Sequence, residues 1–196
     1  MESGGLMKLL EDKILKEGKV YPGEVLKVDS FVNHQIDVPF ISELGKEFYR
    51  RFKNEGVNKI LTIEASGIGI ASLTALHFGC PVVFAKKGET NNMSPDVYTS
   101  KVYSYTHQRE YGIRVSKDYI KPGDRVLVID DFLATGNALE ALLDIVKESG
   151  ATLCGAGVVI EKAFQPGGDT IRSRGIRVES LARIASMEGD KITFTE

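Results

Sequence analysis

The stretch that decides the fold is Arg125-Val-Leu-Val-Ile-Asp-Asp-Phe-Leu-Ala-Thr-Gly-Asn-Ala-Leu-Glu-Ala-Leu142. Residues 126–129 are apolar and mostly β-branched, which is typical of a buried parallel strand. Two carboxylates, Asp130 and Asp131, follow where we expect that strand to end. A turn of small residues over 134–138 comes next, and apolar residues then recur at helical spacing from Leu139. The predicted order is strand, acidic tip, small-residue loop and helix.

The loop and the acids have complementary chemistry. The N-terminus of a helix presents unpaired N–H groups and a partial positive charge, which suit a phosphate. Gly136 permits a positive φ and a close approach of the backbone, while Thr135 adds a hydroxyl donor. Ionised Asp130 and Asp131 only accept hydrogen bonds, so they suit sugar hydroxyls or the water shell of a metal ion. The stretch therefore predicts a site for a ribose phosphate.

Residues 126–136 resemble the signature of the type I phosphoribosyltransferase family, whose members use phosphoribosyl diphosphate (PRPP). The resemblance implies an α/β fold, in which a mainly parallel twisted sheet is flanked by helices and carries a small hood subdomain. It also implies that Asp130 and Asp131 act at the reaction centre. The PRPP phosphate would be bound by Ala134, Thr135, Gly136, Asn137 and Ala138. Ala138 stands where many members have threonine, so the backbone must contribute more there.

Composition narrows the classes of function. The chain has 196 residues and 42% hydrophobic residues, enough for one domain with a core. Its net charge of −2 gives no basic field for nucleic acid. We expect no membrane span and no secretion signal, because no apolar run or charged leader has the required pattern. Cys80 and Cys154 lie in apolar surroundings, which indicates buried free thiols and a cytoplasmic location. His and Cys show no metal-ligand spacing.

The N-terminal part is predicted to contain a helix, the hood and a second helix. A helical pattern runs from Met7 to Gly18, and residues 1–6 are either a frayed end or an added tail. Residues 20–31 read as extended, and the resemblance assigns about 20–37 to the hood together with part of 160–196. Pro39 suits the first turn of the next helix. The core face of that helix repeats every four residues, at Phe40, Leu44, Phe48 and Phe52.

A second strand and loop, residues 59–69, again place small residues between a strand end and a helix start, where open α/β sheets bind ligands. By resemblance, Ala65, Ser66 and Gly67 form the loop that faces pyrophosphate, with a cis peptide at Ala65-Ser66. Residues 81–87 read as a third strand. Lys86 or Lys87 would meet pyrophosphate, in the same or the neighbouring subunit, and we choose Lys87. The alternative is a solvated strand tip.

The remaining chain predicts a covering hairpin and further strands. A mobile active-site loop is expected over about 87–106, with polar residues at 88–96. Residues 97–106 and 110–116 alternate like a hairpin, and the resemblance folds this hairpin over the reacting centre. Ser104-Tyr105 resembles a Ser-Tyr pair of some family members. Further strands are predicted at 152–160, 177–185 and 191–195, with a short helix around Ile171.

Three more stretches, residues 26–37, 160–167 and 177–184, resemble the bacterial xanthine phosphoribosyltransferases. This resemblance spans nearly the whole chain from Met7. It implies a homodimeric, Mg²⁺-dependent enzyme of purine salvage, which transfers the 5-phosphoribosyl group of PRPP to xanthine and forms xanthosine 5′-monophosphate and pyrophosphate. Mg²⁺ would be held mainly by substrate and water. Positions Leu26, Asn33 and Lys162 would contact xanthine.

The residue types fit that base. An ammonium at Lys162 suits an oxo group or an anionic purine, and the amide of Asn33 matches an imide edge. Leu26 would give an apolar contact to the ring. Phe132 or Phe164 either stacks on the base or belongs to the core. For Lys162 the alternative is an ordinary surface lysine.

Other interpretations stay open at this stage. Hypoxanthine–guanine members usually carry an acid at the position of Ala134, whereas adenine members share Ala-Thr-Gly, so guanine, hypoxanthine or adenine are alternative substrates. An alternative that is not an enzyme is a PRPP-sensing purine regulator that binds DNA. Such a protein would require a winged helix and a basic face. A receiver-type signalling domain shares the paired acids but lacks the Thr-Gly loop.

Overall fold

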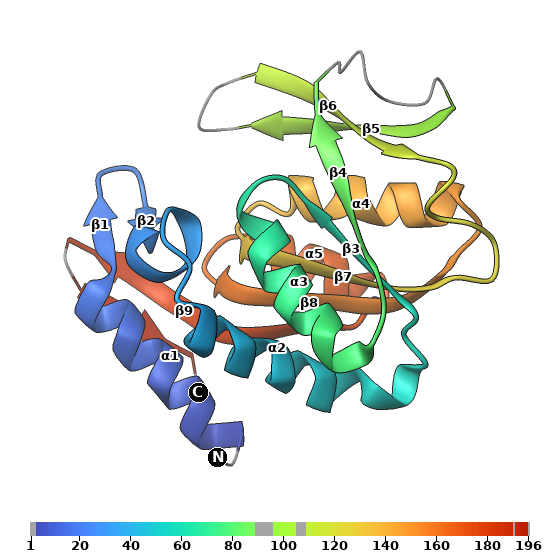
Figure 1. The fold of residues 1–196 in the computed structure, drawn as a ribbon. Coiled ribbons are helices and arrows are strands. Elements are labelled where there is room, and N and C mark those ends of the chain that lie inside the picture. Colours follow the sequence, from blue (N-terminus) through green and yellow to red (C-terminus); the bar gives the residue numbers. More distant parts are fainter. Residues whose placement is uncertain (1–2, 89–95, 105–108, 190, 196) are drawn as a thin grey trace.

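A computed structural model of the chain describes residues 3–88, 96–104, 109–189 and 191–195. Its centre is an eight-stranded sheet of order β10-β9-β8-β7-β3-β4-β6-β5 (Figure 1). The strands are β3 (Lys59–Ile63), β4 (Val82–Lys87), β5 (Val97–Ser104), β6 (Arg109–Ser116), β7 (Arg125–Leu133), β8 (Thr152–Lys162), β9 (Val178–Glu188) and β10 (Lys191–Phe194). The five strands from β9 to β4 pair in parallel, and antiparallel pairs add the strands at both edges. The predicted α/β fold with a mainly parallel sheet is confirmed.

Helices cover both faces of this sheet. They are α1 (Ser3–Glu17), α2 (Val38–Phe52), α3 (Ser66–Phe78), α4 (Asn137–Glu148) and α5 (Gly167–Ser173). Side chains alternate along β7, so that Leu127 and Ile129 join one core cluster with α2 and α3. Val126 and Val128 face the other cluster, which includes the apolar side of α4. Figure 1 shows α3 and α4 on opposite sides of the sheet.

The strand that carries the paired acids is longer than predicted. We expected it to end at Ile129, before the two acids, but β7 continues to Leu133 because its parallel partner β8 runs beside it as far as Glu161. Both aspartates therefore lie on a paired strand rather than at a free tip. Their positions are fixed by the sheet.

The first two helices agree with the sequence pattern except at one end. Helix α1 begins at Ser3, so residues 3–6 are helical instead of frayed. Helix α2 begins after Asp37, whose side chain accepts a hydrogen bond from the Phe40 N–H. Of the predicted core face, Phe40 is partly buried. The other three side chains are fully buried: Leu44, Phe48 and Phe52.

The segment read as extended between α1 and α2 forms a short antiparallel hairpin and a helical turn. The hairpin consists of β1 (Lys19–Tyr21) and β2 (Val25–Lys27), and the π-helical turn η1 (Asp29–Asn33) follows. Figure 1 shows the hairpin standing beside β9 above α1. A 3-10 turn, η2 (Lys53–Glu55), closes α2 before Gly56, which has φ +64°.

The predicted covering hairpin is present in the part of the chain that the structure describes. Strands β5 and β6 pair along their whole length, and β6 joins the main sheet at Lys86 and Lys87 of β4. Much of the segment expected to be mobile is strand β5, while residues 89–95 and 105–108, including Tyr105, lie outside the described residues.

Two further expectations concern the cysteines and the membrane. Both thiols are free, but only Cys154 is buried, since Cys80 is partly exposed. Burial raises the pKa of both thiols. No described helix combines the length and apolar character that crossing a bilayer requires.

The crossing of α2 and α3 gives a first test of the packing. A Cβ on Gly45 would lie 2.9 Å from the carbonyl carbon of Leu73 and 2.9 Å from the Thr74 nitrogen. Gly45→Val is therefore expected to lower the free energy of unfolding by about 1–3 kcal/mol, the usual range for overpacking. Chemical denaturation measures the change. Gly5→Ala is the control, because nothing lies within 4 Å of a Cβ there; equal losses in both variants would contradict the close approach.

Candidate active site

Two adjoining cavities lie at the carboxyl ends of the central strands. The larger, of about 660 Å³, is bounded by residues 22–25, the turn between β1 and β2 that we call the hood turn. The β5–β6 hairpin, residues 132–139 and the end of β8 form its other walls. The smaller, of about 240 Å³, is bounded by residues 63–67, the end of β4 and the paired acids. Both are lined by Tyr111, Phe132 and Ala138. They form one candidate site with two compartments.

The small-residue loop lines the larger compartment along its whole length. Gly136 has φ +90° and caps α4, and its carbonyl accepts the Glu140 N–H at 2.8 Å. The other loop residues of the prediction, Ala134, Thr135, Asn137 and Ala138, line the same compartment. Asn137 Nδ2 donates to the carbonyl of Tyr103 at 3.0 Å, so the hairpin is tied to the first residue of α4.

Asp130 is a buried carboxylate with an exposed fraction of only 4%. Its Oδ1 accepts the backbone N–H of Asp131 at 2.9 Å. Burial, and then the adjacent Asp131 carboxylate, raise the pKa of Asp130 well above its ordinary value, while Lys87 acts in the opposite sense. Hydrogen bonds from ligand hydroxyls, or a positive charge on a ligand, would stabilise the ionised form of this buried carboxyl.

Asp131 receives a hydrogen bond from the hood. Asn33 Nδ2, on η1, lies 2.6 Å from Asp131 Oδ2 and 3.1 Å from Ser66 Oγ. A carboxylate can only accept, so the amide must present its NH₂ group to Asp131. Asn33 Oδ1 is buried and has no partner among the described residues. Asn33 thus connects the hood, the acids and the 65–67 loop, and leaves one acceptor unused.

The 65–67 loop differs from the prediction at the cis peptide. The cis bond joins Glu64 and Ala65, one residue earlier than expected. The Ala65-Ser66 bond belongs to the start of α3, since Ala65 already has helical φ and ψ. Ala65, Ser66 and Gly67 all line the smaller compartment.

The two lysines at the end of strand β4 line different cavities. Lys87 lines the smaller compartment, and its backbone N–H donates to Glu64 Oε1 at 2.6 Å. Lys86 lines a different cavity, of about 440 Å³, with Phe84 and Tyr119. This follows from the alternation of side chains along a strand.

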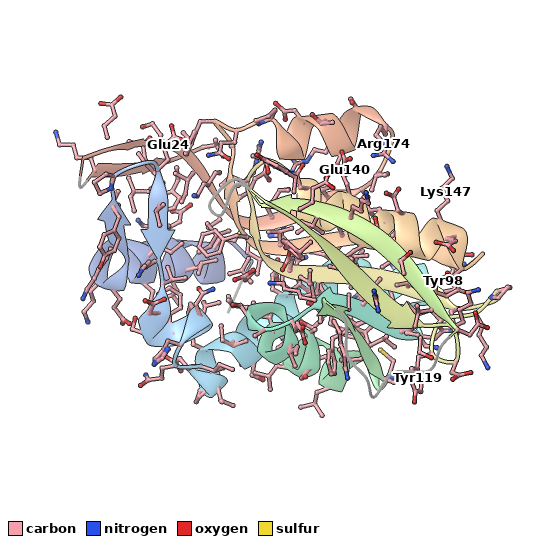
Figure 2. The ribbon with its side chains drawn as sticks, turned by 90° about the horizontal axis from the view of Figure 1, so that it is seen from above. Glu24, Tyr98, Tyr119, Glu140, Lys147 and Arg174 are labelled. Carbon is pink, nitrogen blue, oxygen red and sulfur yellow. The ribbon has the colours of Figure 1, made fainter. Side chains whose placement is uncertain are left out.

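At the other end of the site, Lys162 holds the hood turn. Its Nζ donates to the carbonyl of Glu24 at 2.6 Å, and Gln165 Nε2 donates to Glu24 Oε2 at 2.9 Å. Figure 2 labels Glu24 at this turn. Burial lowers the pKa of Lys162, partly offset by Glu24. Phe132 and Phe164 line the same compartment.

Leu26 does not lie on either compartment's lining. It is 6% exposed and packs in the core with α1 and the hood. Its neighbours Glu24 and Val25 reach the larger compartment instead. A direct contact between the Leu26 side chain and a base stays a prediction.

The lining residues that sequence reasoning missed include Glu24, Glu64 and Tyr111. Glu24 has φ +60°, which is uncommon for a residue other than glycine. The Pro22-Gly23 pair is a turn signal that could have located it. Tyr111 has no comparable signal, because only the pairing of β6 brings it over the acids.

The buried acid gives a test with a definite sign. Its raised pKa means that, as pH rises above the ordinary value, the unfolded chain ionises before the folded one, so folding stability falls. Asp130→Asn should therefore raise the unfolding midpoint at pH 7, by about 2–4 °C if the effect is about 1 kcal/mol. The gain should be smaller at pH 5.

Thermal unfolding at both pH values measures this gain. Asp131→Asn is the matched comparison, because Asp131 is only partly buried and accepts from Asn33. That variant should show a smaller gain, because it removes the neighbouring charge but leaves the burial of Asp130 unchanged. A lower midpoint for Asp130→Asn at pH 7 would contradict the burial penalty.

Comparison with known proteins gives the family. The Phosphoribosyl transferase domain matches residues 29–174. Xanthine phosphoribosyltransferase 2 of Clostridium botulinum is 57% identical over 189 residues, 96% of this chain and 100% of the relative. Xanthine phosphoribosyltransferase of Clostridioides difficile is 52% identical over 189 residues, with the same shares of both chains.

Solved structures show the same fold at lower identity. Adenine phosphoribosyltransferase of Giardia lamblia with 9-deazaadenine has a TM-score of 0.76 at 22% identity, covering 89% of this chain and 97% of that one. The Trypanosoma brucei enzyme with AMP, pyrophosphate and ribose-5-phosphate has a TM-score of 0.74 at 22% identity, covering 89% and 79%. The paired acids and the 134–138 loop lie at one edge of the sheet, and the domain match includes both. This chain therefore belongs to the phosphoribosyltransferase family.

Proposed function

We propose that the chain transfers the 5-phosphoribosyl group from PRPP to xanthine, giving xanthosine 5′-monophosphate and pyrophosphate in purine salvage. The observation that carries the choice of base is a pair of polar side chains, Asn33 and Lys162. Each of them keeps hydrogen-bonding capacity that no described residue uses. Relatives with the xanthine activity in their names are more than half identical over nearly the whole chain. The physical argument below is independent of those names.

Asn33 acts as an acceptor in this site. Both hydrogens of its NH₂ group are engaged by Asp131 and Ser66, so the buried Oδ1 can only take an N–H from a ligand. Xanthine offers ring N–H groups to such an acceptor. The nitrogens within adenine's six-membered ring are acceptors, so on that ring only the exocyclic amine could pair with Oδ1. A site in which the wrong base leaves a buried polar group unpaired discriminates strongly against that base.

Lys162 acts as the donor. Its ammonium carries three N–H groups, of which one goes to the Glu24 carbonyl. The others can meet an oxo group or the negative charge of a purine anion. Adenine has an amine where xanthine has an oxo group. Lys162 lines the larger compartment, whereas Asn33 is in the lining of neither compartment and lies behind Ser66 and Asp131 of the smaller one. The cation at Lys162 is therefore the group that directly favours the oxo groups of xanthine.

The chemistry is displacement at C1 of the ribose. The bond from C1 to the pyrophosphate oxygen breaks, the electron pair leaves with pyrophosphate, and a purine nitrogen forms the new bond to C1. Asp130 and Asp131 hold the ribose hydroxyls and favour the positive charge that develops on the sugar. The 134–138 loop holds the 5′-phosphate, and Lys87 with the 65–67 loop receives pyrophosphate. No general base is required if the purine enters as an anion.

Mg²⁺ fits the donors of the smaller compartment. Glu64 and Asp131 supply hard carboxylate oxygens there. Within the described residues, no group of three or more His, Cys, Asp or Glu side chains could hold an ion. An ion at this place would keep water and substrate oxygens as most of its ligands. When bound, it would neutralise charge on the diphosphate.

A homodimer is part of the same proposal. Phe84 and Tyr119, which are 39% and 62% exposed, line the cavity that also contains Lys86. A patch of exposed large apolar side chains is typical of an interaction surface. Sedimentation of the purified protein measures the oligomeric state.

The free thiols agree with a reducing compartment such as the cytoplasm.

The decisive experiment offers each purine in turn with PRPP and Mg²⁺ and separates the nucleotide products. Xanthosine 5′-monophosphate is expected at the highest kcat/KM. Formation of the adenine nucleotide without the xanthine nucleotide would overturn the proposal.

The role of Lys162 can be tested by Lys162→Met, which keeps much of the stem and removes the charge. Loss of a charged hydrogen bond is worth about 1.5–3 kcal/mol, so the KM for xanthine should rise by one to two orders of magnitude. The KM for PRPP should change little. Lys147→Met is the control, because Lys147 lies in the last turn of α4 and points into solvent (Figure 2). Equal rises in both KM values would exclude a base-reading role.

A further inference from the structure

The 134–136 backbone rests on the first residue of α5. The Gly167 N–H donates to the carbonyl of Ala134 at 3.1 Å. A Cβ on Gly167 would lie 2.5 Å from the Gly136 nitrogen and 2.6 Å from the Thr135 carbonyl carbon. Backbone is therefore packed against backbone with no room for a side chain. The place of Gly167 decides where the loop can lie.

The next glycine is packed against a buried ion pair. A Cβ on Gly168 would lie 2.6 Å from Arg172 Nη1 and would also overlap the Glu161 carboxylate. Arg172 Nη1 and Nη2 donate to Glu161 Oε1 and Oε2 at 2.7 and 2.6 Å. This two-pronged geometry fixes distance and orientation together. Helix α5 is thus fastened to the end of β8.

The Glu161 carboxylate is 1% exposed and fully engaged. Ser180 Oγ on β9 donates to Oε2 at 2.5 Å, and Arg183 Nε lies 3.3 Å from the same oxygen without hydrogen-bond alignment. Burial alone would raise the pKa of Glu161, but the hydrogen bonds from Arg172 and Ser180 outweigh it and lower the pKa. The carboxylate stays ionised beneath the site.

We propose that Glu161 and Arg172 are positioning residues for the phosphate loop, because their ion pair holds α5 where Gly167 supports residues 134–136. The role of that loop rests on the function proposed above. Neither Glu161 nor Arg172 lines either compartment, so neither touches substrate.

The proposal predicts an effect on one substrate in particular. Arg172 fastens α5, and Gly167 at the start of α5 packs directly against the loop for the 5′-phosphate. Arg183 reaches the same carboxylate from β9, where its Nη2 donates to Glu161 Oε1 at 3.5 Å, and it does not belong to α5. Loss of the Arg172 fork should therefore loosen phosphate binding, whereas loss of Arg183 should not. A merely stabilising ion pair would make no such distinction.

The experiment uses the full chain with three variants. Arg172→Lys keeps the charge but cannot form the fork. Gly167→Ala pushes directly on the loop, and Arg183→Met is the control. Arg172→Lys and Gly167→Ala should each raise the KM for PRPP roughly tenfold, while kcat and the KM for xanthine stay within about twofold. Arg183→Met should leave the KM for PRPP unchanged.

Titration with ribose 5-phosphate measures the loop without any base. The Kd should weaken in Arg172→Lys and Gly167→Ala by the same factor as the KM for PRPP. The proposal is overturned if Arg172→Lys and Arg183→Met change the KM for PRPP equally, or if Arg172→Lys lowers the unfolding midpoint and leaves that KM unchanged. Thermal unfolding of each variant accompanies the kinetics. If the wild type forms no xanthosine 5′-monophosphate, the function fails, but this titration still decides the role of the ion pair.

Discussion

Parallel pairing of β3, β7 and β8 is the constraint on which the site depends. Parallel strands bring their carboxyl ends to one edge of the sheet, and the chain then has to return through a helix each time. Residues 64–67 and 130–138 follow or end neighbouring strands and therefore meet there. The loop that begins α4 and the loop that begins α3 consequently line two adjoining compartments. An anionic ligand with two phosphate-bearing ends matches that geometry.

Several polar groups of the site are buried without full compensation by the protein, and a bound ligand can supply the missing interactions. Asp130 is buried beside a second carboxylate, and Asn33 Oδ1 has no partner among the described residues. Such groups destabilise an empty protein, because buried charges and unpaired acceptors are unfavourable. Elsewhere, a comparably buried acid is fully paired, as Glu161 is with Arg172 and Ser180. The contrast separates residues that act on a ligand from residues that hold the scaffold.

Local pattern was sufficient for most of the fold. The apolar run at 126–129, the four-residue repeat from Phe40 and the Thr-Gly loop each determine an element within one window of sequence. The strand through Asp130 was misjudged because its length depends on β8, which is distant in sequence. The bond between Asn33 and Asp131 spans 98 residues, so no local pattern could reveal it. The cis peptide lies one residue earlier than expected, at Glu64-Ala65, and α3 begins at Ser66, within the stretch that the sequence analysis read as a loop.

Lys86 and Lys87 are joined by a single peptide unit, yet one faces the reaction compartment and the other faces the apolar cavity on the outer side. The same two residues are where the covering hairpin is attached to the sheet. Strand β4 is therefore a wall that the two cavities share, with Lys86 on one side and Lys87 on the other.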